Sequence, residues 1–139
     1  MADRISKEKR SANMARIRSK NTLIEIRFRK GLYKLGIRYS LNYMIFGKPD
    51  LVILSKRVAV FVNGCFWHQH EKCKLGYLPK SNVVFWETKL SKNRERDKMV
   101  RMQLKREGWK VITIWECEIV ENLEKTLKNT ARTINSLNT

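Results

Sequence analysis

The spacing of hydrophobic positions predicts an amphipathic helix near the start of the chain. Apolar residues recur every three or four positions over residues 22–35, and Gly36 ends the pattern. Thr22 and Glu25 form a capping-box pattern at the first turn. The predicted apolar face consists of Ile24, Phe28, Leu32 and Leu35.

Short continuous apolar runs predict strands. Residues 50–54 and 58–62 are two such runs, and Ser55-Lys56-Arg57 separates them as a tight turn. Asp50 stands at the head of this strand-turn-strand unit. We also predict a strand over residues 39–46 and a third core strand over residues 109–115.

Charged segments predict the remaining helices. A long helix is predicted from residue 81 to residue 107, ending at Gly108, and a polar helix over residues 119–136. Residues 63–79 contain glycine, proline and most of the cysteine and histidine, which indicates a loop. The alternation of strands and helices predicts one α/β domain over residues 1–139.

The charge of the chain indicates a polyanionic partner. Thirty Lys and Arg residues against 13 Asp and Glu give a net charge of +17 and a pI near 10.2. Seven of these cations lie in residues 1–20, Arg10 and Arg16 among them, which predicts a basic arm or short helix on nucleic acid. A solvated basic surface, a ribosomal role and a membrane-surface role fit the charge alone.

Composition excludes several classes of protein. Hydrophobic residues make up 42% of the chain and charged residues 31%, which argues against disorder. The longest apolar runs, such as Val58–Val62, are far too short to span a bilayer. The first residues lack the apolar segment of a secretory signal, so we expect a cytoplasmic protein that is nucleoid-associated when it acts.

The cysteines and histidines have the spacing of a metal site. Cys65, His68, His70 and Cys73 fall within nine residues, and Cys117 follows a predicted core strand that could return beside them. A structural Zn²⁺ site takes four such ligands in a tetrahedron, and three cysteines with one histidine are a common set. Spacing does not decide between His68 and His70, and packing of buried cysteines is the alternative.

Asp50 is the candidate for a catalytic carboxylate. Pro49-Asp50 before an apolar strand is the first half of the Pro-Asp…(Asp/Glu)-x-Lys nuclease pattern, in which carboxylates at strand ends hold Mg²⁺. An ordinary turn gives the same dipeptide. Residues 58–62 supply neither the second acid nor the lysine of the pattern. A nuclease here therefore needs another base, for which the histidine beside Trp67 is the candidate.

Seven segments of the chain carry a family resemblance: Arg10–Met14, Ile24-Glu25, Gly47–Asp50, Asn63–His68, Phe85-Trp86, Lys92–Asp97 and Gly108–Cys117. In this order, these motifs resemble those of the very short patch repair (Vsr) DNA mismatch endonucleases. The resemblance covers about residues 8–118 and is most specific at residues 64–68 and 115–117. It implies a restriction-endonuclease-like, PD-(D/E)xK-type fold with a central mixed sheet flanked by helices. It also implies a nick on the 5′ side of the thymine in a T·G mismatch, which arises when 5-methylcytosine deaminates.

The resemblance implies two metals. Asp50 would bind catalytic Mg²⁺ together with the main-chain carbonyl of Val62, and Glu25 would reach its water shell. By position in the family's motifs, His68 would be the general base and His70 a ligand of the second metal. Asn63 stands where a histidine is common and retains the capacity to hydrogen-bond a phosphate. The structural Zn²⁺ would be held by Cys65, His70, Cys73 and Cys117.

The resemblance also implies how the mismatch is recognised. Phe66, Trp67 and Trp86 would form an aromatic wedge that enters the duplex, with Met14 contacting it from the minor-groove side. Each role has a structural alternative, because Phe66 and Trp86 could be packing residues and Glu25 could only close the capping box. The loop between His70 and Cys73 is one residue longer than is usual in the family.

Partners and rival functions follow from the same resemblance. We expect a monomer that acts on double-stranded DNA, is associated with a DNA cytosine methyltransferase, and has the repair protein MutL as a candidate partner. One alternative is a related nuclease with another DNA substrate. Another is a zinc-containing DNA-binding protein without catalysis, in which Asp50 and His68 are structural.

Overall fold

A three-stranded sheet forms the centre of the computed structural model, which describes residues 23–71, 73 and 77–137. Strand β2 (Val58–Asn63) lies between β1 (Leu51–Ile53), which is antiparallel to it, and β3 (Lys110–Trp115), which is parallel. A parallel pair needs a crossover, and helix α3 (Val83–Arg106) supplies it. The mixed α/β architecture is therefore as predicted.

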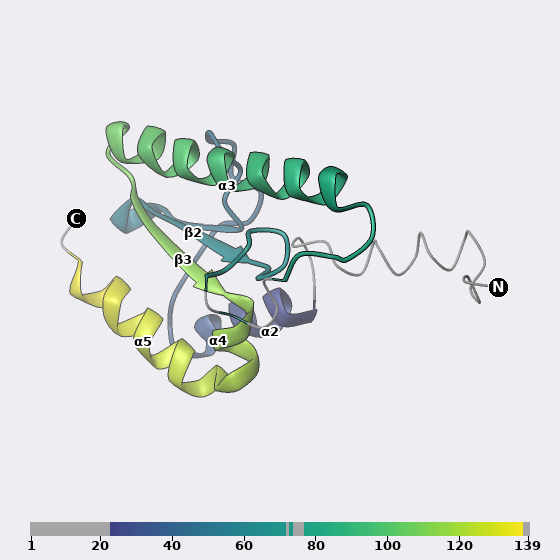
Figure 1. Cartoon of the computed structure of the whole chain (residues 1–139). Helices are drawn as coiled ribbons and strands as arrows, with labels where there is room; N and C mark the ends of the chain where they lie inside the picture. The colour runs from purple at the N-terminus through teal and green to yellow at the C-terminus, as the bar shows by residue number, and fades with distance from the viewer. Residues whose placement is uncertain (1–22, 72, 74–76, 138–139) are drawn as a thin grey trace.

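Helices cover both faces of this sheet. Figure 1 shows α3 along one face, and α2 (Leu23–Lys34), α4 (Glu116–Glu121) and α5 (Leu123–Ser136) on the other. Alternate residues of β2 divide between the two layers, since Val58, Val60 and Val62 pack with α2 and α5 whereas Ala59 packs with α3. Burial on both faces explains why the strand is continuously apolar rather than alternating.

Most predicted elements are confirmed within a few residues. Helix α2 matches the predicted helix over residues 22–35, and α3 matches the one over residues 81–107. Both strands of the strand-turn-strand unit form, joined by a 3₁₀ turn (η1, Leu54–Lys56). Within the described chain, no helix combines the length and the apolar character needed to cross a bilayer.

The predicted strand over residues 39–46 is wrong. Only Ser40 makes a bridge, to Val52, and the segment then folds into turns. Asn42 has a positive φ of 56°, and the backbone N–H of Ile45 donates to the carbonyl of Tyr43 at 3.0 Å. These turns stop the ladder because a left-handed residue bends the chain away from an extended path.

The single helix predicted over residues 119–136 is two helices. Helix α4 starts earlier, at Glu116, and Asn122 separates it from α5 with an extended φ of −158°. The Asn122 side chain caps α5 by accepting a hydrogen bond from the backbone N–H of Lys125 at 3.0 Å. The break turns the buried face of α5, including Leu127 and Ile134, onto the sheet.

Candidate active site and metal centre

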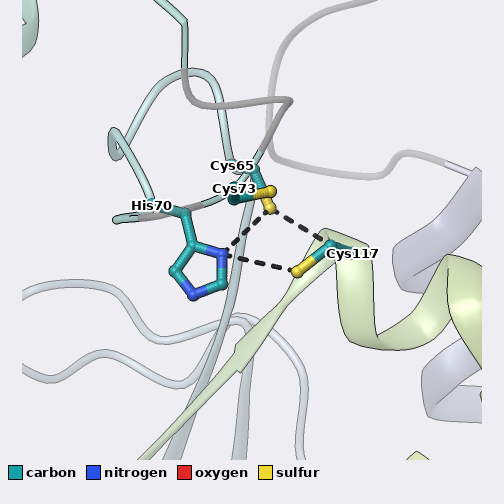
Figure 2. A group of neighbouring side chains, drawn as sticks. All are labelled: Cys65, His70, Cys73 and Cys117. Atoms are coloured by element: carbon teal, nitrogen blue, oxygen red, sulfur yellow. Dashed lines mark hydrogen bonds between the residues drawn. The ribbon is translucent and has the colours of Figure 1, made fainter.

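Three cysteines and one histidine converge beside the end of β3. Figure 2 shows their side chains pointing toward one another, with three residues from the loop after β2 and the fourth from the first turn of α4. The four candidate ligand atoms lie within 4.8 Å of one another. The group consists of Cys65, His70, Cys73 and Cys117, and we call it the Cys/His group. Despite the longer loop, Cys73 belongs to it.

The spacing of the Cys/His group fits a tetrahedral metal site. Nδ1 of His70 lies 3.6 Å from Sγ of Cys65 and 3.4 Å from Sγ of Cys117. Zinc bonds of about 2.0–2.3 Å give a tetrahedron whose edges are roughly 3.3–3.8 Å, so these separations need little adjustment. The donor set of three sulfurs and one imidazole is also that of structural zinc sites.

Burial shapes the chemistry of the sulfurs. It raises the pKa of the Cys65 thiol well above its usual value, against the hydrogen bond that this sulfur accepts from the backbone N–H of Cys117 at 3.4 Å. Burial likewise raises the pKa of Cys117. A metal that binds these sulfurs as thiolates must therefore displace their protons.

Two neighbours of Cys117 support the Cys/His group. Trp115 stacks on the His70 ring, with centroids 4.0 Å apart and planes 9° from parallel. The Glu116 carboxylate accepts a hydrogen bond from the backbone N–H of Cys65 at 3.2 Å. Neither role was predicted, although Trp115-Glu116-Cys117 was recognised as a motif. Only the parallel pairing of β2 and β3 brings this motif beside the loop.

The other histidine of the loop has a different partner. Nδ1 of His68 hydrogen-bonds Oδ2 of Asp97 on α3, and the two side chains are only 17% and 23% exposed. An ionised carboxylate only accepts hydrogen bonds, so in the tautomer with the proton on Nδ1 this contact leaves the lone pair of Nε2 for another proton. The arrangement is that of an oriented general base. Asp97 was part of a recognised motif, but no role had been predicted for it.

The His68–Asp97 pair opens onto a cavity of about 450 Å³ between α3 and the sheet. Asp50, just before β1, also lines it, and its Oδ2 accepts a hydrogen bond from the backbone N–H of Val62 at 2.6 Å. The cavity therefore brings together a carboxylate, an oriented imidazole and several cations. Its polar lining residues include Lys48, Asp50, Asn63, His68, Asn93, Arg96, Asp97 and Arg101.

The aromatic residues after Cys65 form one cluster at the edge of this cavity. Phe66 contacts Trp67 and Trp86 at ring centroid distances of 5.2 and 5.5 Å, and the two tryptophans lie 5.9 Å apart. Phe66 is buried, whereas Trp67 and Trp86 are partly exposed. Lys89 places its ammonium 5.3 Å from the Trp67 ring.

The remaining predicted site residues are either absent from the cavity lining or outside the described part of the chain. Glu25 is buried on α2, 3.9 Å from the guanidinium of Arg29, and does not line the cavity. Its predicted cap partner Thr22, together with Met14, Arg10 and Arg16, lies outside the described residues.

Comparison with known proteins supports the resemblance. A family model described as DNA mismatch endonuclease Vsr matches residues 2–75. DNA mismatch endonuclease Vsr of Escherichia coli is 38% identical over 86% of this chain and 76% of its own length. The chain belongs to the Vsr family. Two further relatives of this Vsr-family chain are type II nicking enzymes. V.XorIIP of Xanthomonas oryzae pv. oryzae is 42% identical over 93% of this chain and 96% of its own length. V.NmeAIP of Neisseria meningitidis is 44% identical over 86% of this chain and 85% of its own length.

Proposed function

We propose that this Vsr-family member is a DNA mismatch endonuclease that nicks one strand on the 5′ side of the thymine in a T·G pair. The observation that carries the proposal is that Asp50 and the His68–Asp97 pair line one cavity. Metal-assisted phosphodiester hydrolysis needs a carboxylate for the metal and a base for the water. The names of the relatives, a mismatch endonuclease and nicking enzymes, support the same reaction.

Several residues of the site have a role in this reaction. Asp50 and the Val62 carbonyl would hold Mg²⁺. Glu25 does not line the cavity, so its proposed link to the metal would run through the metal's water shell. Bound Mg²⁺ would supply Lewis-acid charge at the scissile phosphate. His68 takes a proton from the attacking water, and Asp97 keeps its ring oriented. Asn63, which lines the cavity, donates a hydrogen bond to the phosphate, and the products are a 3′-hydroxyl and a 5′-phosphate.

We further infer a restriction-endonuclease-like fold and one functional domain over residues 1–139. The mixed sheet with Asp50 at a strand end and helices on both faces supports this inference. Residues 1–20 would act as a basic arm, with Arg10 and Arg16 contacting DNA. The Cys/His group would hold one structural Zn²⁺ that ties the loop after β2 to the start of α4.

Mismatch discrimination is expected to depend on the aromatic cluster. We propose that Phe66, Trp67 and Trp86 enter the duplex, with Met14 on the minor-groove side. Separating bases costs less at a weakened T·G step than at a matched one, and each base stacked on a ring returns roughly 1–3 kcal/mol. Trp67→Ala and Trp86→Ala should therefore lose most of the preference for T·G over T·A duplex in a nicking assay.

A matched control is available on α2. Tyr33 is an exposed ring on the opposite face of the sheet, so Tyr33→Ala should keep the parent's preference. If both tryptophan variants also keep it, the rings are packing residues, and a related nuclease with another DNA substrate becomes the better assignment. If the parent binds DNA but never nicks it, the better assignment is a zinc-containing DNA-binding protein without catalysis.

Binding to DNA is expected to weaken steeply with salt. A chain of net charge +17 releases condensed counterions when its cations meet phosphates, so log affinity should fall linearly with log salt. Replacing both Arg10 and Arg16 by Ala should reduce the slope by about 2. Fluorescence anisotropy across a salt series measures this slope. An affinity that does not change with salt would remove the basic surface from the DNA interface.

We also propose that the chain works as a monomer, in association with a DNA cytosine methyltransferase and with MutL as a candidate repair partner. The link to the methyltransferase rests on chemistry, because deaminated 5-methylcytosine is the source of the T·G pair. Sedimentation of the chain alone and with MutL tests both assembly states.

A further inference from the structure

The cations of the cavity have no role in the reaction described so far, and one of them lies beside Asp50 in the sequence. Lys48 lines the cavity from the loop that precedes β1, two residues before Asp50. The arginines of the lining, Arg96 and Arg101, lie on α3 instead. Among the described residues that line the cavity, Lys48 is thus the only lysine or arginine in the segment that carries Asp50, the proposed catalytic carboxylate.

The backbone at Lys48 is held in an unfavourable conformation. Its φ is +49°, in the left-handed region that non-glycine residues rarely adopt, and the residue before a proline is restricted further. The Lys48 N–H donates to the carbonyl of Ile45 at 3.2 Å, and a Cβ on Gly47 would lie 2.4 Å from Cγ1 of Val100. The turn is therefore pressed against α3, which fixes where the Lys48 side chain starts. Such retained strain is common at functional sites.

The ammonium group of Lys48 is available to an anion. Across the described part of the chain, no ion pair or side-chain hydrogen bond of Lys48 is formed. Asp50 is close in sequence, but one of its oxygens already accepts the Val62 N–H. Moreover, β2 lacks the lysine of the Pro-Asp…(Asp/Glu)-x-Lys pattern, because residues 58–62 are all apolar. The lysine of that pattern is therefore missing from β2, and Lys48 offers an ammonium group from the loop before β1 instead.

We propose that Lys48 is a catalytic residue whose ammonium binds a non-bridging oxygen of the scissile phosphodiester. This rests on the proposed nicking reaction. In that reaction the water oxygen bonds to phosphorus, its proton passes to His68, and the bond to the 3′ oxygen breaks, with that oxygen taking a proton from solvent. Negative charge grows on the phosphate oxygens in between, and a fixed cation stabilises it more than it stabilises bound substrate.

The test compares Lys48→Met, which keeps the side-chain length without the charge, with Lys48→Arg, which keeps the charge. Single-turnover nicking of T·G duplex should slow by about 10²-fold in the Met variant, the size of effect seen when one preorganised donor is removed. Its Kd for the duplex should change by less than about threefold. The Arg variant should recover most of the rate. Lys128, exposed on α5, provides the matched control Lys128→Met, which should nick like the parent.

Several outcomes would overturn the proposal. An unchanged nicking rate in Lys48→Met removes Lys48 from the reaction, and a raised Kd with an unchanged rate makes it an ordinary DNA contact. If Lys48→Met and Lys48→Arg lose the same nicking rate and both melt at a lower temperature, the role of Lys48 is to hold the turn and not to bind the phosphate. Failure of the underlying function is distinguishable, because then the parent does not nick T·G duplex or Asp50→Asn nicks as fast as the parent.

Discussion

Replacing Asp50 by Asn, or His68 by Ala, is expected to abolish nicking while DNA binding persists. Asp50→Asn removes the proposed direct ligand of Mg²⁺, and His68→Ala removes the base, whose contribution is typically 10²–10⁴-fold. Both side chains line the cavity, whereas binding depends on the basic surface of a chain with net charge +17. Rates with excess enzyme and affinities by anisotropy, measured on one T·G duplex, separate the two effects.

The controls follow from the geometry of the cavity. Asp97→Asn keeps a hydrogen-bond partner for His68 but no longer favours the tautomer with the proton on Nδ1, so a large loss of nicking is expected. Glu121→Gln makes the same acid-to-amide change at an exposed position outside the cavity and should leave nicking unchanged. Near-parental activity of Asp50→Asn in Mg²⁺ would place the reaction elsewhere on the molecule.

Loss of the metal is expected to destabilise the whole chain. The Cys/His group joins the loop after β2 to the start of α4, and structural zinc contributes its binding energy to folding. One Zn²⁺ per chain should co-purify, and Cys117→Ala should lose it and melt about 10 °C or more below the parent. Metal analysis and calorimetry with and without a chelator measure the two effects.

The two histidines of the loop give a matched pair for this test. His70→Ala should lose the metal, because Nδ1 of His70 belongs to the Cys/His group. His68→Ala should keep it, since His68 is paired with Asp97. A structural zinc site would be contradicted if the purified parent contains no zinc, or if Cys117→Ala melts at the same temperature as the parent.

Acid is expected to release the metal. Burial raises the pKa of Cys65 and Cys117, so the metal-free group holds its protons. Binding as thiolates expels those protons, so the metal-bound fold carries fewer of them. Its stability relative to the metal-free chain therefore increases with pH and falls as pH is lowered. Retained zinc should decrease on acid titration, and this loss should accompany the fall in melting temperature.

The sequence by itself determined the elements and the kinds of chemistry. The 3.6-residue period over α2 and the apolar runs of β1, β2 and β3 are local signals, because a buried face imposes its spacing on the chain. The cysteine and histidine spacing predicted a metal site, and the motifs identified the family. Local signals failed at residues 39–46 and at Asn122, where left-handed or extended backbone ended a hydrophobic pattern that continued in the sequence.

Only the tertiary structure decided which residues act together. Spacing alone could not choose between His68 and His70, because both lie on one short loop, and the family resemblance assigned them without a physical reason. The choice depends on what approaches that loop from afar: Asp97 on α3 meets His68, and Cys117 after β3 meets His70. Lys48 and Trp115 acquired their places in the same way, through the packing of α3 against a turn and the parallel pairing of β2 with β3. These contacts join residues distant in sequence, and their free energy comes from burying both faces of the sheet.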